Sequence, residues 1–165
     1  MRHSESVPIA DGHFPTMMLL VFTDLDGTLL DHHSYSWAPA RPALASLHER
    51  GDAVMLVSSK TLAEISTFRR ELGLPHPVVA ENGAVIDVPD GYFAGADLPV
   101  VVSQFRATLQ QHYLEEKTRC HYHCDAFFEL GVAGIMRETG LDESQAVLAN
   151  ERVASEPILW RDSKA

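Results

Sequence analysis

The sequence is short of cysteine and of basic residues, and both shortages limit what the chain can be. Its only two cysteines, Cys120 and Cys124, stand four residues apart, which argues against a disulfide framework and fits a reducing compartment. Lysine and arginine total 13 against 23 acidic residues, a formal net charge of −10. Such a chain repels nucleic acid and anionic membranes, because their phosphates carry the same charge. We therefore expect no nucleic-acid partner and no membrane partner.

Long apolar segments are missing as well. The longest run near the N-terminus, residues 17–22, is far too short to cross a bilayer as a helix. It also lacks the basic start and the small-residue cleavage site of a signal peptide. The residues before it are polar with proline and glycine, so we expect residues 1–18 to form a flexible extension. With the low cysteine count, these features predict a cytoplasmic protein.

The apolar pattern of the first half predicts strands that alternate with helices. Each expected strand is a short β-prone run, and turn or capping residues stand at the ends of the expected helices. Thr61 and Glu64 form a capping-box pattern that opens the second helix. This order of elements predicts the α/β class, with a parallel sheet and helical crossovers. The expected elements are strands 19–23, 53–57 and 76–80 and helices 39–50 and 61–72.

The pattern changes in the second half. Residues 89–99, PDGYFAGADLP, are rich in turn-forming types, and a new set of amphipathic segments follows them. We place a boundary after residue 84 and expect a second α/β unit over residues 85–165. Its expected elements are helices 100–117, 132–139 and 142–150 and a short strand within residues 119–130.

Two aspartates, Asp24 and Asp26, directly follow the first expected strand. Carboxylates this close repel each other unless a cation or a shared proton intervenes. Mg²⁺ suits them, because it favours a few carboxylate oxygens together with water and substrate phosphate. An aspartate beside Mg²⁺ can attack phosphorus while a second carboxylate handles the leaving-group proton. Gly27 allows a tight turn that brings backbone N–H groups close to a phosphate.

Other readings of this stretch differ in how well they fit. An EF-hand loop that began at Asp24 would need glycine and glutamate where Leu29 and Tyr35 stand, and no P-loop pattern occurs. A plain Asp-Gly turn after a strand fits the two aspartates by themselves. However, a second polar cluster, Ser58-Ser59-Lys60, follows the second strand. Open α/β sheets bind ligands at the carboxyl ends of their strands, so both clusters are expected at one ligand-binding edge.

Two segments carry a family resemblance. VFTDLDGTLL, residues 21–30, resembles the first signature of the haloacid dehalogenase (HAD) superfamily of phosphohydrolases, and VMLVSSKT, residues 54–61, resembles the second. The resemblance implies that Asp24 is the nucleophile and Asp26 the general acid/base, and that both hold Mg²⁺. It further implies a phosphate-binding set, for which we take Gly27, Ser58, Ser59 and Lys60. A lysine exposed to water at a helix start is the alternative for Lys60.

A narrower resemblance rests on three segments. SSKTLAEI (58–65), AENGAVI (80–86) and TGLDESQAVLANERVASEPILW (139–160) together resemble mannosyl-3-phosphoglycerate phosphatases. The resemblance implies a Mg²⁺-dependent enzyme that forms an aspartyl-phosphate and releases phosphate from mannosyl-3-phosphoglycerate or a related sugar-acid phosphate. It implies a Rossmannoid parallel sheet with an inserted α/β cap of the C2 type. A sucrose-phosphate or general sugar-phosphate phosphatase with the same cap is an alternative.

The same resemblance assigns residues to the substrate. Glu81, Asn82 and Gly83 are expected to line the substrate pocket, with a simple Asn-Gly turn as the alternative. Arg152 is expected to meet the glycerate carboxylate, with a solvent-exposed salt bridge as the alternative. Both assignments place the substrate between the two expected units.

The resemblance also implies later signatures, a lysine and a Gly-Asp-x-x-x-Asp segment, that follow the cap. No Gly-Asp pair occurs after Ala84. We therefore expect residues 19–84 to be the first half of the core and residues 85–165 the cap, with the second half of the core absent. On this expectation Mg²⁺ is held weakly, and the alternative function is an impaired remnant or a binding module.

Overall fold

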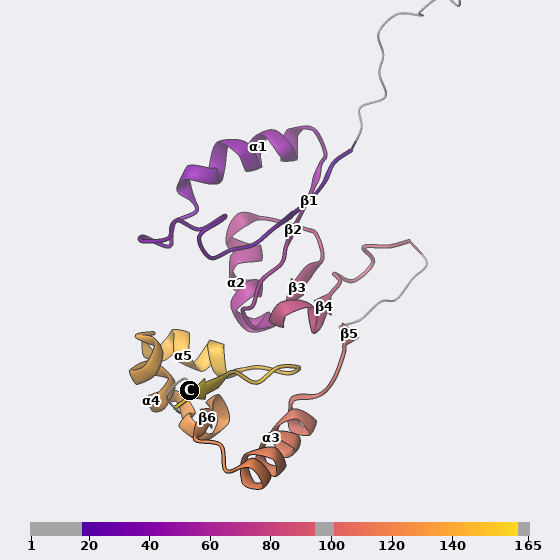
Figure 1. The fold of residues 1–165 in the computed structure, drawn as a ribbon. Helices are drawn as coiled ribbons and strands as arrows, with labels where there is room; N and C mark the ends of the chain where they lie inside the picture. Colours follow the sequence, from indigo (N-terminus) through magenta and orange to yellow (C-terminus); the bar gives the residue numbers. More distant parts are fainter. Residues whose placement is uncertain (1–17, 95–100, 162–165) are drawn as a thin grey trace, which may run out of the picture.

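The computed structural model describes residues 18–94 and 101–161, so nearly all of the expected N-terminal extension lies outside the described residues. Figure 1 shows two units that follow one another along the chain, with α1 and α2 in the first and α3, α4 and α5 in the second. The helices and strands are β1 (Leu20–Thr23), α1 (Arg41–Glu49), β2 (Ala53–Leu56), α2 (Leu62–Leu72), β3 (Val78–Ala80), β4 (Val85–Asp87), β5 (Val101–Val102), α3 (Arg106–Cys120), β6 (Cys124–Ala126), α4 (Phe127–Thr139), α5 (Glu143–Asn150) and β7 (Ile158–Trp160).

The first unit has the predicted parallel arrangement. β1 pairs in parallel with β2, and a parallel bridge between Val57 and Val79 brings β3 alongside β2. α1 and α2 form the two crossovers. The predicted capping box is present, since Thr61 Oγ1 accepts from the Glu64 N–H at 3.1 Å and the Thr61 N–H donates to Glu64 Oε2 at 2.8 Å. The α/β class with helical crossovers is confirmed.

An apolar cluster under this sheet extends past the expected domain boundary. Leu25, Leu56 and Val85 are fully buried in it. Val85 belongs to β4, which pairs antiparallel with β3, and β5 pairs antiparallel with β4. β4 therefore pairs with a strand of the first unit, and the domain boundary expected after residue 84 stays a prediction. This pairing is local, because only residues 81–84 separate the two strands.

The second half of the chain contains two strands, β5 and β7, that the sequence analysis did not predict. Residues 101–102 form β5, and α3 begins only at Arg106, although a helix was expected from residue 100. Two adjacent β-branched valines at a sheet edge favour the strand. The expected short strand is β6, which pairs antiparallel with β7, and the other two expected helices correspond to α4 and α5.

β1 has an open edge among the described strands. β2 occupies one side of it, and no other strand pairing of β1 occurs within residues 18–94 and 101–161. Its apolar side chains Leu20 and Phe22 are 55% and 58% exposed. Such an edge presents unpaired backbone groups to which another strand can add.

Within the described part of the chain, no helix has both the length and the apolar character that crossing a bilayer requires.

Candidate functional site

The two aspartates follow β1 in a stretch where exposed and buried side chains alternate. Leu25 is fully buried in the apolar cluster, whereas its neighbours Asp24 and Asp26 are exposed. Backbone bonds close the turn behind them, because the Leu29 N–H donates to the Asp24 carbonyl at 3.3 Å and the Leu30 N–H donates to the Leu25 carbonyl at 2.8 Å. The buried leucine thus anchors the turn and keeps both carboxylates at the surface.

Gly27 makes this turn possible through its backbone conformation. Its φ is +69°, in the left-handed region that side chains other than glycine rarely adopt. Space is not the constraint, since a Cβ at this position would meet only His32 Nδ1, at 3.8 Å. The expected tight turn at Gly27 is present, and its role in binding phosphate stays a prediction.

The second polar cluster lies beside Asp24, as the sheet-edge expectation requires. Ser58 is almost fully buried, and its N–H donates to the Val79 carbonyl at 2.9 Å. Its Oγ accepts from the Lys60 N–H at 3.3 Å. Asp24, Val57, Ser58, Ser59 and Asn82 line one open pocket of about 510 Å³. The structure therefore brings a carboxylate, two hydroxyls and an amide to one place.

Lys60 pairs with Asp26 in this structure. Its Nζ lies 3.1 Å from Asp26 Oδ1 and 3.9 Å from Glu64 Oε1. The ammonium also lies 5.7 Å from the centroid of the Tyr35 ring. The sequence reasoning did not single out Tyr35, and nothing in its local pattern indicated this contact. Lys60 is thus oriented toward the candidate site, and its side chain is only 17% exposed.

The three residues after β3 separate into two environments. Glu81, Asn82 and Gly83 all have positive φ, of 51°, 58° and 93°. Asn82 lines the Asp24 pocket, and neither of its neighbours belongs to that lining. Glu81 is instead buried, 1% exposed, and its carboxylate accepts hydrogen bonds from residues 153–155. The substrate role of Glu81 and Gly83 stays a prediction, and these hydrogen bonds occupy the Glu81 carboxylate.

Arg152 reaches the same region from the second unit. Its Nη1 donates to the Ser59 carbonyl at 3.2 Å and to Ser155 Oγ at 2.9 Å. Its Nε is buried and has no hydrogen-bond partner among the described residues. Burial lowers the pKa of the Arg152 guanidinium, and the nearby Glu81 carboxylate opposes that effect. The structure therefore brings Arg152 to the Ser59 backbone beside the pocket.

Asp24 and Asp26 are the residues that would hold a metal ion at this site. Among residues 18–94 and 101–161, no group of three or more His, Cys, Asp or Glu side chains is placed to hold one. Both aspartates are exposed, so water and a substrate phosphate can supply further oxygen ligands. Mg²⁺ is commonly bound by one or two carboxylates with such ligands, so the donors fit this ion.

Comparisons with known proteins bear on the family and the fold of the chain. A family model described as haloacid dehalogenase-like hydrolase matches residues 21–129. A solved structure from Thermoplasma acidophilum aligns with a TM-score of 0.52 and 22% identity, over 65% of this chain and 44% of its own. A HAD-superfamily phosphatase from Bacteroides thetaiotaomicron aligns with a TM-score of 0.50 and 20% identity, over 74% of this chain and 41% of its own.

A third solved structure is described as a HAD subclass IIB sugar phosphatase. It aligns with a TM-score of 0.52 and 15% identity, over 82% of this chain and 56% of its own. At these identities the likeness shows a shared fold. The chain spans less than two thirds of the length of each of these three structures.

Proposed function

Because the chain belongs to the family of haloacid dehalogenase-like hydrolases, we propose that it is a Mg²⁺-dependent phosphatase of sugar-acid phosphates. Mannosyl-3-phosphoglycerate is the substrate that we propose first. The observation that carries the proposal is the pocket that Asp24 lines together with Ser58, Ser59 and Asn82. This pocket offers a nucleophile and several hydrogen-bonding groups for phosphate oxygens at one sheet edge.

The proposed chemistry uses the two aspartates in turn. An Asp24 carboxylate oxygen attacks phosphorus, the bond to the leaving oxygen breaks, and Asp26 gives that oxygen a proton. A water molecule then attacks the phosphorus of the aspartyl-phosphate while Asp26 takes its proton. The bond between phosphorus and the Asp24 oxygen breaks, inorganic phosphate leaves, and both residues are restored. When bound at Asp24 and Asp26, Mg²⁺ supplies positive charge that offsets the repulsion between carboxylate and phosphate.

Neighbouring groups position the phosphate in this proposal. Ser58 and Ser59 line the same pocket as Asp24 and offer their hydroxyl groups to a phosphate. Lys60, held 3.1 Å from Asp26, can turn its ammonium to a phosphate oxygen when a substrate enters. Ser58 is fixed by its bond to β3, so the loop that carries these groups is already shaped before a ligand binds.

In this proposal the second unit supplies the group that recognises the carboxylate of a sugar-acid phosphate, which an ordinary sugar phosphate lacks. Arg152 brings a positive charge to Ser59, at the rim of the site, where a glycerate carboxylate can pair with it. The neighbour described as a sugar phosphatase supports a substrate that contains a sugar. A general sugar-phosphate phosphatase shares the pocket but gives Arg152 no carboxylate to bind.

Phosphate release tests the proposal. We expect the purified chain to release inorganic phosphate from mannosyl-3-phosphoglycerate in the presence of Mg²⁺ and to stop when EDTA removes the metal. Release from glucose 6-phosphate and sucrose 6-phosphate, measured in parallel, separates the sugar-acid preference from general activity. Faster release from the two phosphates that lack a carboxylate would contradict the substrate assignment. No release from any of them would contradict turnover by this chain.

One observation favours a second candidate, a phosphate-binding module without turnover. The described residues bring no third acidic or histidine side chain to Asp24 and Asp26, so a metal held there depends on water and ligand for its remaining bonds. Under this candidate, calorimetric titration detects binding of inorganic phosphate and Mg²⁺ while the release assay stays at the blank rate.

A further inference from the structure

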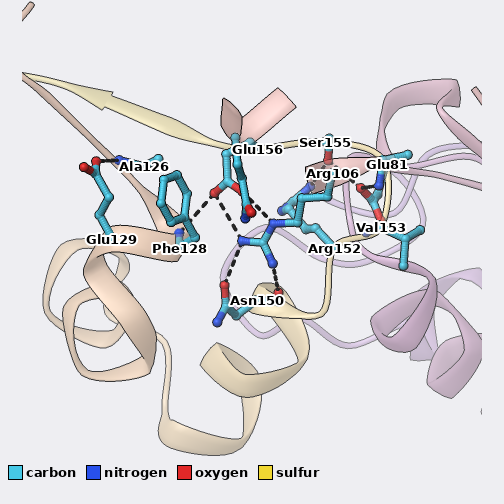
Figure 2. Close-up of polar contacts among 12 residues, drawn as sticks. Glu81, Arg106, Ala126, Phe128, Glu129, Asn150, Arg152, Val153, Ser155 and Glu156 are labelled. Atoms are coloured by element: carbon cyan, nitrogen blue, oxygen red, sulfur yellow. Dashed lines mark hydrogen bonds and ion pairs between the residues drawn. The ribbon is translucent and has the colours of Figure 1, made fainter. Parts of the chain in front are cut away.

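Residues 152–156, which we call the docking segment, connect α5 to β7 and contact both units. On the second unit, the Glu156 carboxylate accepts from Arg106, from Gln110 Nε2 at 3.1 Å and from the Phe128 N–H at 3.1 Å. Arg106 also donates to the Asn150 carbonyl and, through its N–H, to the Val153 carbonyl at 2.7 Å. Figure 2 shows Glu156 and Arg106 at the centre of this network. The docking segment is thus fixed to its own unit.

On the first unit, the Glu81 side chain binds the docking segment through hydrogen bonds. Glu81 accepts from the Val153 N–H at 2.9 Å, from the Ala154 N–H at 3.1 Å and from Ser155 Oγ at 2.6 Å. Figure 2 shows its carboxylate directed at this segment. Ala154 is 5% exposed and belongs to the apolar cluster of the first unit. Glu81 therefore accepts three hydrogen bonds from one stretch of the second unit.

The backbone of the same turn is bonded to the candidate phosphate loop, residues 58–60. The Glu81 N–H donates to the Lys60 carbonyl at 2.9 Å, and the Asn82 N–H donates to the Ser58 carbonyl at 3.1 Å. Arg152 donates to the carbonyl between them, that of Ser59, at 3.2 Å. Each carbonyl of the phosphate loop is thus held by the turn after β3 or by the docking segment.

The buried Glu81 carboxylate makes the turn after β3, and the phosphate loop bonded to it, sensitive to whether the docking segment is in place. A carboxylate only accepts hydrogen bonds, and with 1% exposure Glu81 has almost no access to water that could replace lost donors. Its φ of 51° is uncommon for a side chain of this length and persists where the surroundings hold it. Withdrawal of the docking segment would leave the carboxylate unpaired and the turn free to relax, together with the loop bonded to it.

We propose that Glu81 is a positioning residue that couples docking of residues 152–156 to the geometry of the phosphate loop. Glu81 does not touch the substrate in this role. It keeps the carbonyls of Ser58 and Lys60 in place, and their side chains and N–H groups with them, while the second unit is docked. The consequence for phosphate handling rests on the proposed function, whereas the coupling itself does not.

Glu81→Gln tests the coupling, because it keeps the size of the side chain and replaces one acceptor oxygen by a donor. Hydrogen exchange in the full chain should quicken at the Val153 and Ala154 amides by at least about tenfold, as for a lost hydrogen bond. Exchange at the Asn82 and Lys60 amides should quicken by about threefold or more, since the loop relaxes with the turn. Affinity for inorganic phosphate with Mg²⁺ should fall by about fivefold.

Glu129→Gln is the matched control. Glu129 also accepts from a backbone N–H, that of Ala126, and from a hydroxyl, that of Tyr113, but both donors lie in its own unit. We expect this variant to leave exchange at the Asn82 and Lys60 amides and phosphate affinity unchanged within about twofold, even where the melting temperature falls. A second, milder variant, Ser155→Ala, removes one donor to Glu81 and should shift the same amides in the same direction by less.

The outcomes separate the two proposals. In one outcome, exchange quickens at the Val153 and Ala154 amides in both the Glu81→Gln and the Ser155→Ala variant, but the Asn82 and Lys60 amides do not change. This outcome would overturn the coupling and leave Glu81 as a purely structural contact. An equal response of the phosphate loop to Glu129→Gln would overturn it as well. If the loop amides respond only to the Glu81 and Ser155 variants while the unaltered chain binds no phosphate, the coupling stands and the proposed function fails.

Discussion

Asp24→Asn is expected to lower phosphate release by about a thousandfold or more, the scale of loss seen when a nucleophile is removed. The amide of asparagine is too weak a nucleophile to form the covalent acyl phosphate. The local fold should persist, because the asparagine carbonyl oxygen can still accept from the Leu25 N–H, which donates to Asp24 Oδ1 at 2.7 Å. Initial rates of phosphate release with Mg²⁺, at several substrate concentrations, measure the effect on kcat separately from KM.

The matched control for Asp24→Asn is a carboxylate outside the site. Asp90 is exposed in the loop after β4, and Asp90→Asn changes the net charge by the same amount. Its rate should stay within about twofold of the unaltered chain, as for surface substitutions. If Asp24→Asn retained more than a tenth of the rate, Asp24 would not be the nucleophile. The pocket would then need another group to attack phosphorus.

Leu25→Ala is expected to lower the free energy of unfolding by about 2–5 kcal/mol, the usual range for a leucine removed from a packed interior. Leu25 is fully buried and packs in the cluster that contains Leu56 and Ile65. The same change should also slow phosphate release at temperatures where the variant is folded, because the leucine anchors the turn that carries both aspartates. Urea unfolding followed by circular dichroism measures the first effect, and the release assay at low temperature measures the second.

Leu114→Ala provides the comparison for Leu25→Ala. Leu114 lies on α3 and is 45% exposed, so its removal should change the free energy of unfolding by no more than about 0.5 kcal/mol. An equal loss of stability in the two variants would mean that Leu25 does not anchor the turn. A stable Leu25→Ala with unchanged activity would lead to the same conclusion.

The strands and helices of the first unit could be predicted well from sequence, because short stretches of neighbouring residues specify them. Apolar runs that end in polar clusters specified β1, β2 and the sheet edge, and the Thr61 and Glu64 pair specified the start of α2. The juxtaposition of Asp24 with Ser58 followed from the parallel order of the strands, whose carboxyl ends share one edge. These predictions needed no knowledge of distant contacts.

The remaining features depend on contacts between segments that are far apart in sequence. Glu81 reads as part of an Asn-Gly turn, and only the fold shows that residues 153–155 surround its carboxylate. The contact between Lys60 and Tyr35 likewise joins a helix start to a loop whose conformation no local pattern defined.

Ala154 belongs to the second half of the chain but packs inside the apolar cluster of the first unit. The Thr61 hydroxyl, at the start of α2, also donates to the Leu148 carbonyl in α5 at 2.8 Å. If either unit unfolds, the other therefore exposes apolar surface to water and loses a hydrogen-bond partner. Heating should unfold the chain in one cooperative step, with a single calorimetric transition rather than two. The thermal stability of each unit thus depends on its contacts with the other unit.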